Sequence, residues 1–326
     1  MISLADIEAA ASRIARHAVR TPLIESPALN DKLGMRVLIK PETLQRVGAF
    51  KFRGAYNRLV QLTPDQARTG VVAFSSGNHA QGVALAAQML GMPALIVMPS
   101  DAPTIKIEAT RGYGAEIQFY DRMSQDRVAM ANQAARERGA VVVPAFDDLD
   151  IIAGQGTVGR ELVQQVQARG LALAAFIAPV GGGGLLSGCA TAIKALSPKT
   201  AIIGVEPAGY DDTLRSLQAG KKQSVSPGFR TLCDALESPS PGDLTLPILQ
   251  ATVADIAVVT DAEVALAMRY AYTTLKLVVE PGGAVGLAAL LAGKVPLARP
   301  GATVGLVLSG GNVDPGLFAR VLASEV

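Results

Sequence analysis

Residues 175–188 read Ala175-Phe176-Ile177-Ala178-Pro179-Val180-Gly181-Gly182-Gly183-Gly184-Leu185-Leu186-Ser187-Gly188. A short, continuously apolar run is followed by a run of glycines, and the glycines open a helical pattern. Apolar runs of this length are typical of parallel strands that are covered on both faces. The stretch therefore predicts a strand, a glycine loop and a helix, the repeating unit of an α/β fold.

The same pattern recurs along most of the chain. Short β-rich runs alternate with segments of helix length that are rich in Ala, Leu and charged residues. The runs that we interpret as strands are residues 37–39, 71–74, 94–97, 117–119, 141–143, 175–178, 201–205, 256–259 and 303–308. Alternation of this kind predicts an α/β architecture with mostly parallel sheets flanked by helices.

The composition excludes several classes of function. The 326 residues are 49% hydrophobic and 18% charged, which is enough for a large core split into two lobes. A net charge of +2 without a basic block gives no electrostatic support for a nucleic-acid or membrane partner. Residues 1–20 lack the apolar core of a signal peptide, and residues 171–186 are interrupted by proline and glycine. With only two cysteines, we expect a globular cytoplasmic protein.

The glycine run is a candidate phosphate site. Glycines let several backbone N–H groups approach one anion, and the N-terminus of the following helix favours negative charge. A flexible turn is the alternative, but consecutive glycines cost entropy and return no packing. Two nucleotide-binding loops are excluded. The glycine run does not fit the dinucleotide-binding motif G-x-G-x-x-G in any register. Gly77 to Gly82 have the glycine spacing of a P-loop, but Val83 and Ala84 replace its Lys and Ser/Thr.

A second polar loop, Ser75-Ser76-Gly77-Asn78-His79, also lies between a strand and a helix. Its exposed N–H groups suit a carboxylate, and the amide of Asn78 suits an oxygen on a ring. An ordinary helix N-cap is an equally good interpretation of this loop alone.

One lysine is placed for covalent chemistry. Lys51 stands between Phe50 and Phe52 where a helical pattern begins. Burial among apolar groups lowers the pKa of a lysine, and a neutral amine forms a Schiff base with an aldehyde. In isolation, a solvated lysine at a helix start is the simpler interpretation. Together with a phosphate loop and a carboxylate loop, however, Lys51 indicates pyridoxal phosphate, an aldehyde with a phosphate group that acts on amino acids.

The chain resembles the fold-type II pyridoxal-phosphate enzymes, and among them the serine/threonine dehydratase and serine racemase family. The resemblance rests on residues 48–55, 75–82, 181–184 and 309–312, which occur in the family's order and span nearly the whole chain. It implies a two-domain, tryptophan synthase β-like fold and a homodimer. The large domain would comprise residues 1–69 and 147–326, with residues 70–146 inserted as a small domain.

The resemblance also implies a role for individual residues. Lys51 would be the Schiff-base lysine and proton shuttle, and Ser76 would match the acid/base serine of the racemase on the opposite face. The cofactor would be bound by Phe50, Lys51, Asn78, Gly181, Gly182, Gly183, Gly184, Leu185 and Ser309. The substrate carboxylate would be bound by Ser75, Ser76, Gly77, Asn78 and His79.

A divalent-cation site and an activity follow from the same resemblance. Glu206 and Asp212 would supply carboxylates and Tyr210 a backbone carbonyl, oxygen ligands that suit Mg²⁺ or Ca²⁺; a strand end before a capped helix is the alternative. The implied activity is dehydration and deamination of L-threonine or L-serine to a 2-oxo acid. Serine racemisation, dehydration of hydroxyaspartate or another hydroxylated amino acid, and a non-catalytic carrier of the cofactor are the alternatives.

Overall fold

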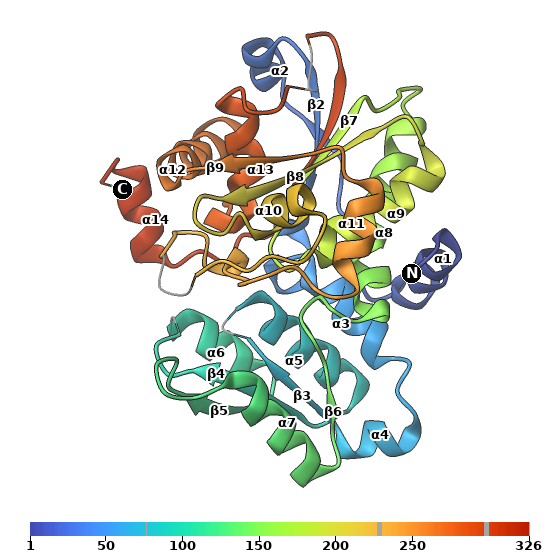
Figure 1. The fold of residues 1–326 in the computed structure, drawn as a ribbon, viewed down its shortest axis with the longest axis vertical. Helices are drawn as coiled ribbons and strands as arrows, with labels where there is room; N and C mark the ends of the chain where they lie inside the picture. The colour runs from blue at the N-terminus through green and yellow to red at the C-terminus, as the bar shows by residue number, and fades with distance from the viewer. Residues whose placement is uncertain (76, 103, 227–229, 297–299, 326) are drawn as a thin grey trace.

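Two sheets form two lobes of the molecule (Figure 1). The computed structural model describes residues 1–325 apart from 76, 103, 227–229 and 297–299. In the described part of the chain, no helix is both long and apolar enough to cross a membrane.

The larger sheet has six strands in the order β1-β2-β10-β7-β8-β9. Its strands are β1 (Ile24–Glu25), β2 (Arg36–Pro41), β7 (Ala175–Pro179), β8 (Ala201–Pro207), β9 (Asp255–Val259) and β10 (Thr303–Leu308). Neighbouring strands are parallel except β1, which pairs with β2 in the antiparallel direction. The sequence pattern missed β1 because a two-residue strand carries no periodicity.

The smaller sheet has four strands in the order β5-β4-β3-β6, and all its pairs are parallel. Its strands are β3 (Val71–Phe74), β4 (Ala94–Pro99), β5 (Glu116–Tyr120) and β6 (Val141–Val142). The predicted α/β class with mostly parallel sheets is confirmed, and each predicted strand overlaps an observed one. All four strands fall within residues 70–146, while the exact domain boundaries stay a prediction.

Helices cover both sheets (Figure 1). They are α1 (Leu4–Ile14), α2 (Pro27–Leu33), α3 (Lys51–Leu59), α4 (Pro64–Thr69), α5 (Asn78–Leu90), α6 (Thr104–Gly112), α7 (Arg127–Arg138), α8 (Leu149–Gln167), α9 (Gly184–Leu196), α10 (Asp212–Ala219), α11 (Thr245–Thr252), α12 (Asp261–Tyr270), α13 (Pro281–Leu291) and α14 (Pro315–Leu322). The apolar helix α13 is buried along almost its whole length within the core of the large sheet. Burial of this apolar surface is the main force that holds the lobe together.

The site is positioned by three strand ends. β3 leads into α5, β7 leads through the glycine loop into α9, and β10 is followed directly by Ser309. The segment before Lys51 lies along the loop after β10, because the N–H of Phe50 donates to the carbonyl of Ser309 at 3.1 Å and the N–H of Gly311 donates to the carbonyl of Gly48 at 2.9 Å. Two stretches more than 250 residues apart are therefore held side by side.

Candidate active site

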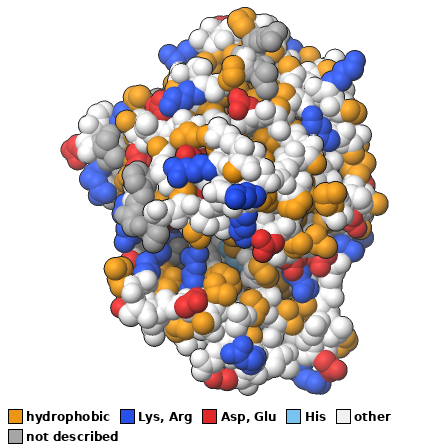
Figure 2. All heavy atoms as spheres, viewed as in Figure 1, with side chains coloured by type: hydrophobic (Ala, Val, Ile, Leu, Met, Phe, Trp, Pro, Cys, Tyr) orange, Lys and Arg blue, Asp and Glu red, His pale blue; other side chains and the backbone are white. Residues whose placement is uncertain are grey.

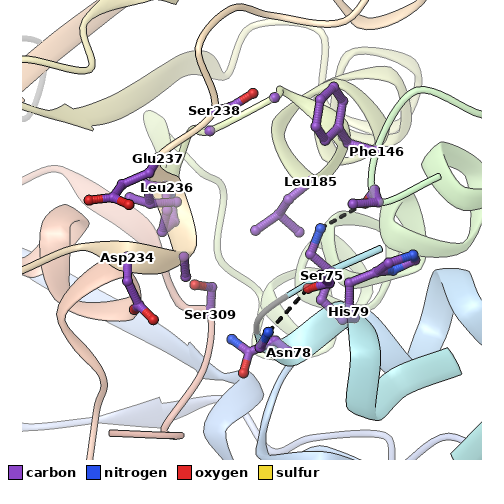
Figure 3. Close-up of a pocket in the computed structure, with 18 of the residues that line it drawn as sticks. Ser75, Asn78, His79, Phe146, Leu185, Asp234, Leu236, Glu237, Ser238 and Ser309 are labelled. Atoms are coloured by element: carbon purple, nitrogen blue, oxygen red, sulfur yellow. Dashed lines mark hydrogen bonds between the residues drawn. The ribbon is translucent and has the colours of Figure 1, made fainter. Parts of the chain in front are cut away.

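A single cleft collects the predicted cofactor and substrate residues. It contains about 1060 Å³ of space, counting the part that is open to solvent. Of the predicted residues, those that line it are Phe50, Lys51, Ser75, Gly77, Asn78, His79, Gly181, Gly182, Gly183, Gly184, Leu185 and Ser309. Figure 2 shows the surface hollowed between the lobes, and Figure 3 shows Asn78, Leu185 and Ser309 around one cavity. Ser76, the predicted opposite-face serine, lies outside the described residues.

Lys51 is the first residue of α3, and its amine reaches into the cleft. Its Nζ donates to the carbonyl of Ala145 at 2.7 Å and lies 5.2 Å from the centre of the Phe50 ring. Burial lowers the pKa of Lys51 to about 8, although the nearby Glu280 carboxylate acts to raise it. A neutral amine is therefore accessible near physiological pH, as a Schiff-base lysine requires.

The glycine loop fits a phosphate group. A Cβ on Gly182 would lie 2.4 Å from atoms of the Phe146 ring, so a side chain there would collide with the ring. Gly183 has φ +93°, and a Cβ on it would lie 2.8 Å from Oγ1 of Thr245. No side chain in the described part of the chain caps the N-terminus of α9, so its first N–H groups stay free for an anion. The residues present therefore fit the phosphate of pyridoxal phosphate.

His79 is held neutral in the wall of the cleft. Its Nε2 lies 2.9 Å from the carbonyl of Val143, which can only accept, so Nε2 carries the proton. Burial, followed by the nearby charge of Lys51, lowers the pKa of His79 to about 3. His79 is therefore a poor proton donor, and its ring serves to shape the cleft.

Charged residues of the cleft that were not predicted from the sequence include Lys106, Arg127, Glu237 and Glu280. Nζ of Lys106 donates to Asp234 at 2.5 Å; burial alone would lower the pKa of Lys106, but Asp234 and Glu280 raise it. Burial raises the pKa of Glu280 to about 7. Of these residues, only Glu280 could have been singled out from the sequence, because it is the charged residue directly before the uncharged segment 281–292.

The predicted cation ligands do not line this cleft. Glu206, near the end of β8, accepts hydrogen bonds from the N–H groups of Thr213 at 2.9 Å and Leu214 at 3.0 Å. Asp212 opens α10, and both its carboxylate oxygens are buried without a hydrogen-bond partner among the described residues. Within that same set, no cluster of three or more His, Cys, Asp or Glu side chains is arranged to hold a metal.

Comparisons with known proteins agree with this geometry. A family model described as "Pyridoxal-phosphate dependent enzyme" matches residues 14–310. The L-threo-3-hydroxyaspartate ammonia-lyase of Pseudomonas sp is 45% identical over 317 residues, 97% of either chain. The serine racemase of Schizosaccharomyces pombe is 39% identical, covering 98% of this chain and 96% of the relative. The solved structure of maize serine racemase is 38% identical, with a TM-score of 0.92 over 99% of this chain and 97% of that one.

Proposed function

The chain belongs to the pyridoxal-phosphate dependent enzyme family, and we propose that it is an ammonia-lyase that removes water and then ammonia from a β-hydroxy amino acid. We further propose 3-hydroxyaspartate as its preferred substrate, ahead of the threonine and serine that the sequence alone favoured. The observation that carries this choice is Arg127. Arg127 lines the cleft, and its guanidinium makes no ion pair or hydrogen bond with any residue that the structure describes.

Several residues of the cleft have assignable roles in such a reaction. When bound, pyridoxal phosphate supplies the electron sink that stabilises the charge left on the α-carbon. The amine of Lys51 accepts the α-proton, and the backbone N–H groups at the start of α5 bind the α-carboxylate. The hydroxyl of Ser309, which lines the cleft, would donate to the ring nitrogen but would not keep it protonated as a carboxylate would. A milder electron sink suits loss of a β-hydroxyl more than a long-lived carbanion.

The atoms of this reaction balance without an oxidant or reductant. The α-proton goes to Lys51, and the β-hydroxyl takes up a proton and leaves as water. The enamine that is released then adds water and loses ammonia, which gives a 2-oxo acid.

The second carboxylate of hydroxyaspartate needs a cation in the cleft. Lys106 is already paired with Asp234, so its charge is neutralised within the protein. The guanidinium carbon of Arg127 lies 5.9 Å from the centre of the Phe74 ring, which supports its flat face. Arginine binds carboxylates through two parallel hydrogen bonds. The resemblance to the Pseudomonas hydroxyaspartate ammonia-lyase supports the same choice.

An assay on a panel of β-hydroxy amino acids tests the proposal. Ammonia and 2-oxo acid would be followed with L-threo-3-hydroxyaspartate, L-threonine and L-serine. We expect Arg127→Ala to lower kcat/KM for hydroxyaspartate roughly 10- to 100-fold, the size of a lost hydrogen bond to a charged group, and to leave threonine within about threefold. Arg111→Ala is the matched control, because Arg111 also lies over a phenylalanine ring, 5.7 Å from that of Phe119, but outside the cleft. Equal losses on all substrates would exclude Arg127 as the specificity residue.

Racemisation of serine is the second candidate activity, supported by the similarity to the S. pombe racemase. It requires a proton donor on the opposite face of the substrate, the role predicted for Ser76. Measuring the chirality of the serine that remains after partial turnover separates the two activities. Appearance of D-serine faster than 2-oxo acid would favour the racemase.

A divalent cation and a cytoplasmic homodimer complete the proposal. Burial and the neighbouring Asp212 carboxylate raise the pKa of Glu206 to about 8, and burial raises that of Asp212 to about 7. Two buried carboxylates that repel each other, one without a partner among the described residues, fit Mg²⁺ or Ca²⁺ with the carbonyl of Tyr210 as a third ligand. The cysteines, both buried and unpaired, fit a reducing compartment. Sedimentation of the purified protein tests the dimer.

A further inference from the structure

A chain of hydrogen bonds joins the first residue of α5 to two distant loops of the larger lobe. Nδ2 of Asn78 donates to Oε1 of Glu280 at 2.5 Å. Nδ2 of Asn312 donates to Oδ1 of Asn78 at 2.8 Å and to the carbonyl of Val47 at 2.7 Å. Asn78 and Glu280 are buried, and Asn312 is partly buried. These hydrogen bonds therefore connect α5, the loop after β10 and the segment that precedes Lys51.

The carboxylate of Glu280 and the carbonyl of Val47 fix the orientation of the two side-chain amides that donate to them. A carboxylate and a backbone carbonyl only accept hydrogen bonds, so each must face an N–H group. Glu280 therefore turns Nδ2 of Asn78 toward itself, and Val47 does the same to Asn312. The oxygen of Asn78 is then taken up by Asn312, and one N–H of Asn78 is left over in the wall of the cleft.

The surrounding backbone is shaped to admit this arrangement. Gly48 has φ +67°, and a Cβ on it would lie 2.7 Å from Oδ1 of Asn312. A Cβ on Gly310 would lie 2.2 Å from Oε1 of Glu280. Val47 has φ +55°, a conformation that is rare for a β-branched residue and persists only where its surroundings impose it. Asn312 holds the carbonyl of this strained residue, four positions before Lys51.

Glu280 is poorly suited to a purely structural role. Its second oxygen, Oε2, is buried and has no hydrogen-bond partner among the described residues. A buried carboxylate with an unsatisfied oxygen costs stability, and a hydrophobic residue of similar volume would cost less. Asn78 lines the cleft, so orienting its amide toward a bound cofactor would give a reason to keep Glu280.

We propose that Glu280 and Asn312 are positioning residues that hold the amide of Asn78 with its remaining N–H toward the cofactor ring. The inference rests on the proposed function, because the contact between Asn78 and a ring oxygen of pyridoxal phosphate is assigned only from the sequence motif and its resemblance. It adds two residues that act on the cofactor through Asn78, and it links them to the segment that carries Lys51.

A double-mutant cycle on the holoenzyme tests this inference. The readouts are the dissociation constant for pyridoxal phosphate and the absorption spectrum of the bound cofactor. We expect Asn78→Ala, Glu280→Leu and Asn312→Ala each to weaken cofactor binding about tenfold and to shift the spectrum, the effect of about one hydrogen bond. In the Asn78→Ala background, Glu280→Leu and Asn312→Ala should have little further effect.

Two additional variants separate positioning from folding. Glu280→Gln keeps an acceptor oxygen toward Asn78 and should restore cofactor affinity to within about threefold of wild type. Asn57→Ala is the matched control, because Asn57 is a buried amide on the same helix as Lys51 that donates to the carbonyl of Asp150 at 2.7 Å, away from the cleft. It should lower the Tm of the apoprotein and leave the cofactor spectrum unchanged.

The inference is overturned if the Glu280 and Asn312 effects add in full to that of Asn78→Ala, since they would then act through the backbone alone. It is also overturned if Glu280→Gln is as damaging as Glu280→Leu. A wild-type protein that binds no pyridoxal phosphate would instead contradict the proposed function, so the two failures are distinguishable.

Discussion

Two groups of buried charged side chains differ in how completely they are paired. The first, the buried ion network, consists of Lys40, Glu42, Arg53 and Glu161 and joins α3 to α8 and to the end of β2. Arg53 donates to Glu42 at 2.8 and 2.9 Å and to Glu161 at 2.8 and 3.0 Å, and Lys40 donates to Glu161 at 2.7 Å. The second group, the unpaired carboxylates, consists of Glu280 and Asp212. Their free oxygens have no partner among the described residues.

This difference distinguishes buried charges that stabilise the fold from buried charges that have a functional role. In the ion network, each charge meets an opposite charge, and Glu42 and Glu161 raise the pKa of Arg53 despite its burial. The network therefore fixes α3, the helix that begins with Lys51. Burial of the unpaired carboxylates raises the pKa of each to about 7, so the protein keeps them at a cost in stability. We infer that their partners come from outside the chain or from groups that contact a ligand.

The largest expected effect is the loss of Lys51. Lys51→Ala removes the proton acceptor of the cleft but breaks no hydrogen bond or ion pair of either group of buried charges, so ammonia release should fall at least about 10³-fold while the Tm changes little. Ammonia assays and thermal unfolding check this. Retained turnover would contradict the assignment of Lys51.

Breaking the ion network should cost stability. Arg53→Met leaves Glu42 and part of Glu161 as unpaired buried charges, which should lower the free energy of unfolding by about 3–5 kcal/mol in denaturant titrations. The control is Arg68→Ala, because Arg68 pairs with Asp65 at the surface, where such pairs contribute little. If Arg53→Met and Arg68→Ala lowered the free energy of unfolding by similar amounts, the buried ion network would contribute no more than a surface ion pair.

Binding of a cation at Asp212 should raise the stability of the folded protein. A carboxyl group whose pKa is raised on folding binds more protons when folded, so the cation-free protein should lose stability as pH rises from 3.8, the ordinary pKa of an aspartate, through about 7. At pH 8, Ca²⁺ at 100 times its Kd should restore about 2.7 kcal/mol. Asp212→Asn should remove the cation effect and weaken the pH dependence, part of which the raised pKa of Glu206 still supplies. Asp243→Asn, which alters an exposed pair with Lys222, should retain both effects. A cation response that survives Asp212→Asn would exclude this site.

The smallest effect concerns the pH dependence of cofactor uptake. Because the pKa of Lys51 is about 8 and only its neutral amine attacks an aldehyde, uptake of pyridoxal phosphate by the apoprotein should quicken about tenfold per pH unit below 8 and level off above it. Glu280→Gln removes a charge that raises this pKa, so it should move the midpoint to lower pH. Stopped-flow absorbance checks both, and a midpoint that moves upward would be inconsistent with the proximity of Glu280 to Lys51.

The sequence predicted what local patterns encode. Apolar runs with helical segments between them indicated nine strands of an α/β fold, since most of these strands are buried on both faces and are therefore continuously apolar. The glycine loop, Asn78 and Ser309 were predictable because each lies in the short segment that follows a strand, where parallel sheets bind ligands. β1 was not predicted, because two residues are too few to form a pattern.

By itself, then, the sequence determined the fold class and the residues that meet at the strand ends, because both depend on neighbours along the chain. Only the tertiary structure decided which charges enter the cleft. Glu280 meets Asn78 across 202 positions of sequence, Asn312 meets it across 234, and Lys106 meets Asp234 across 128. Such contacts arise from the packing of one lobe against the other, and no local pattern of residue types records how two distant segments will be brought together.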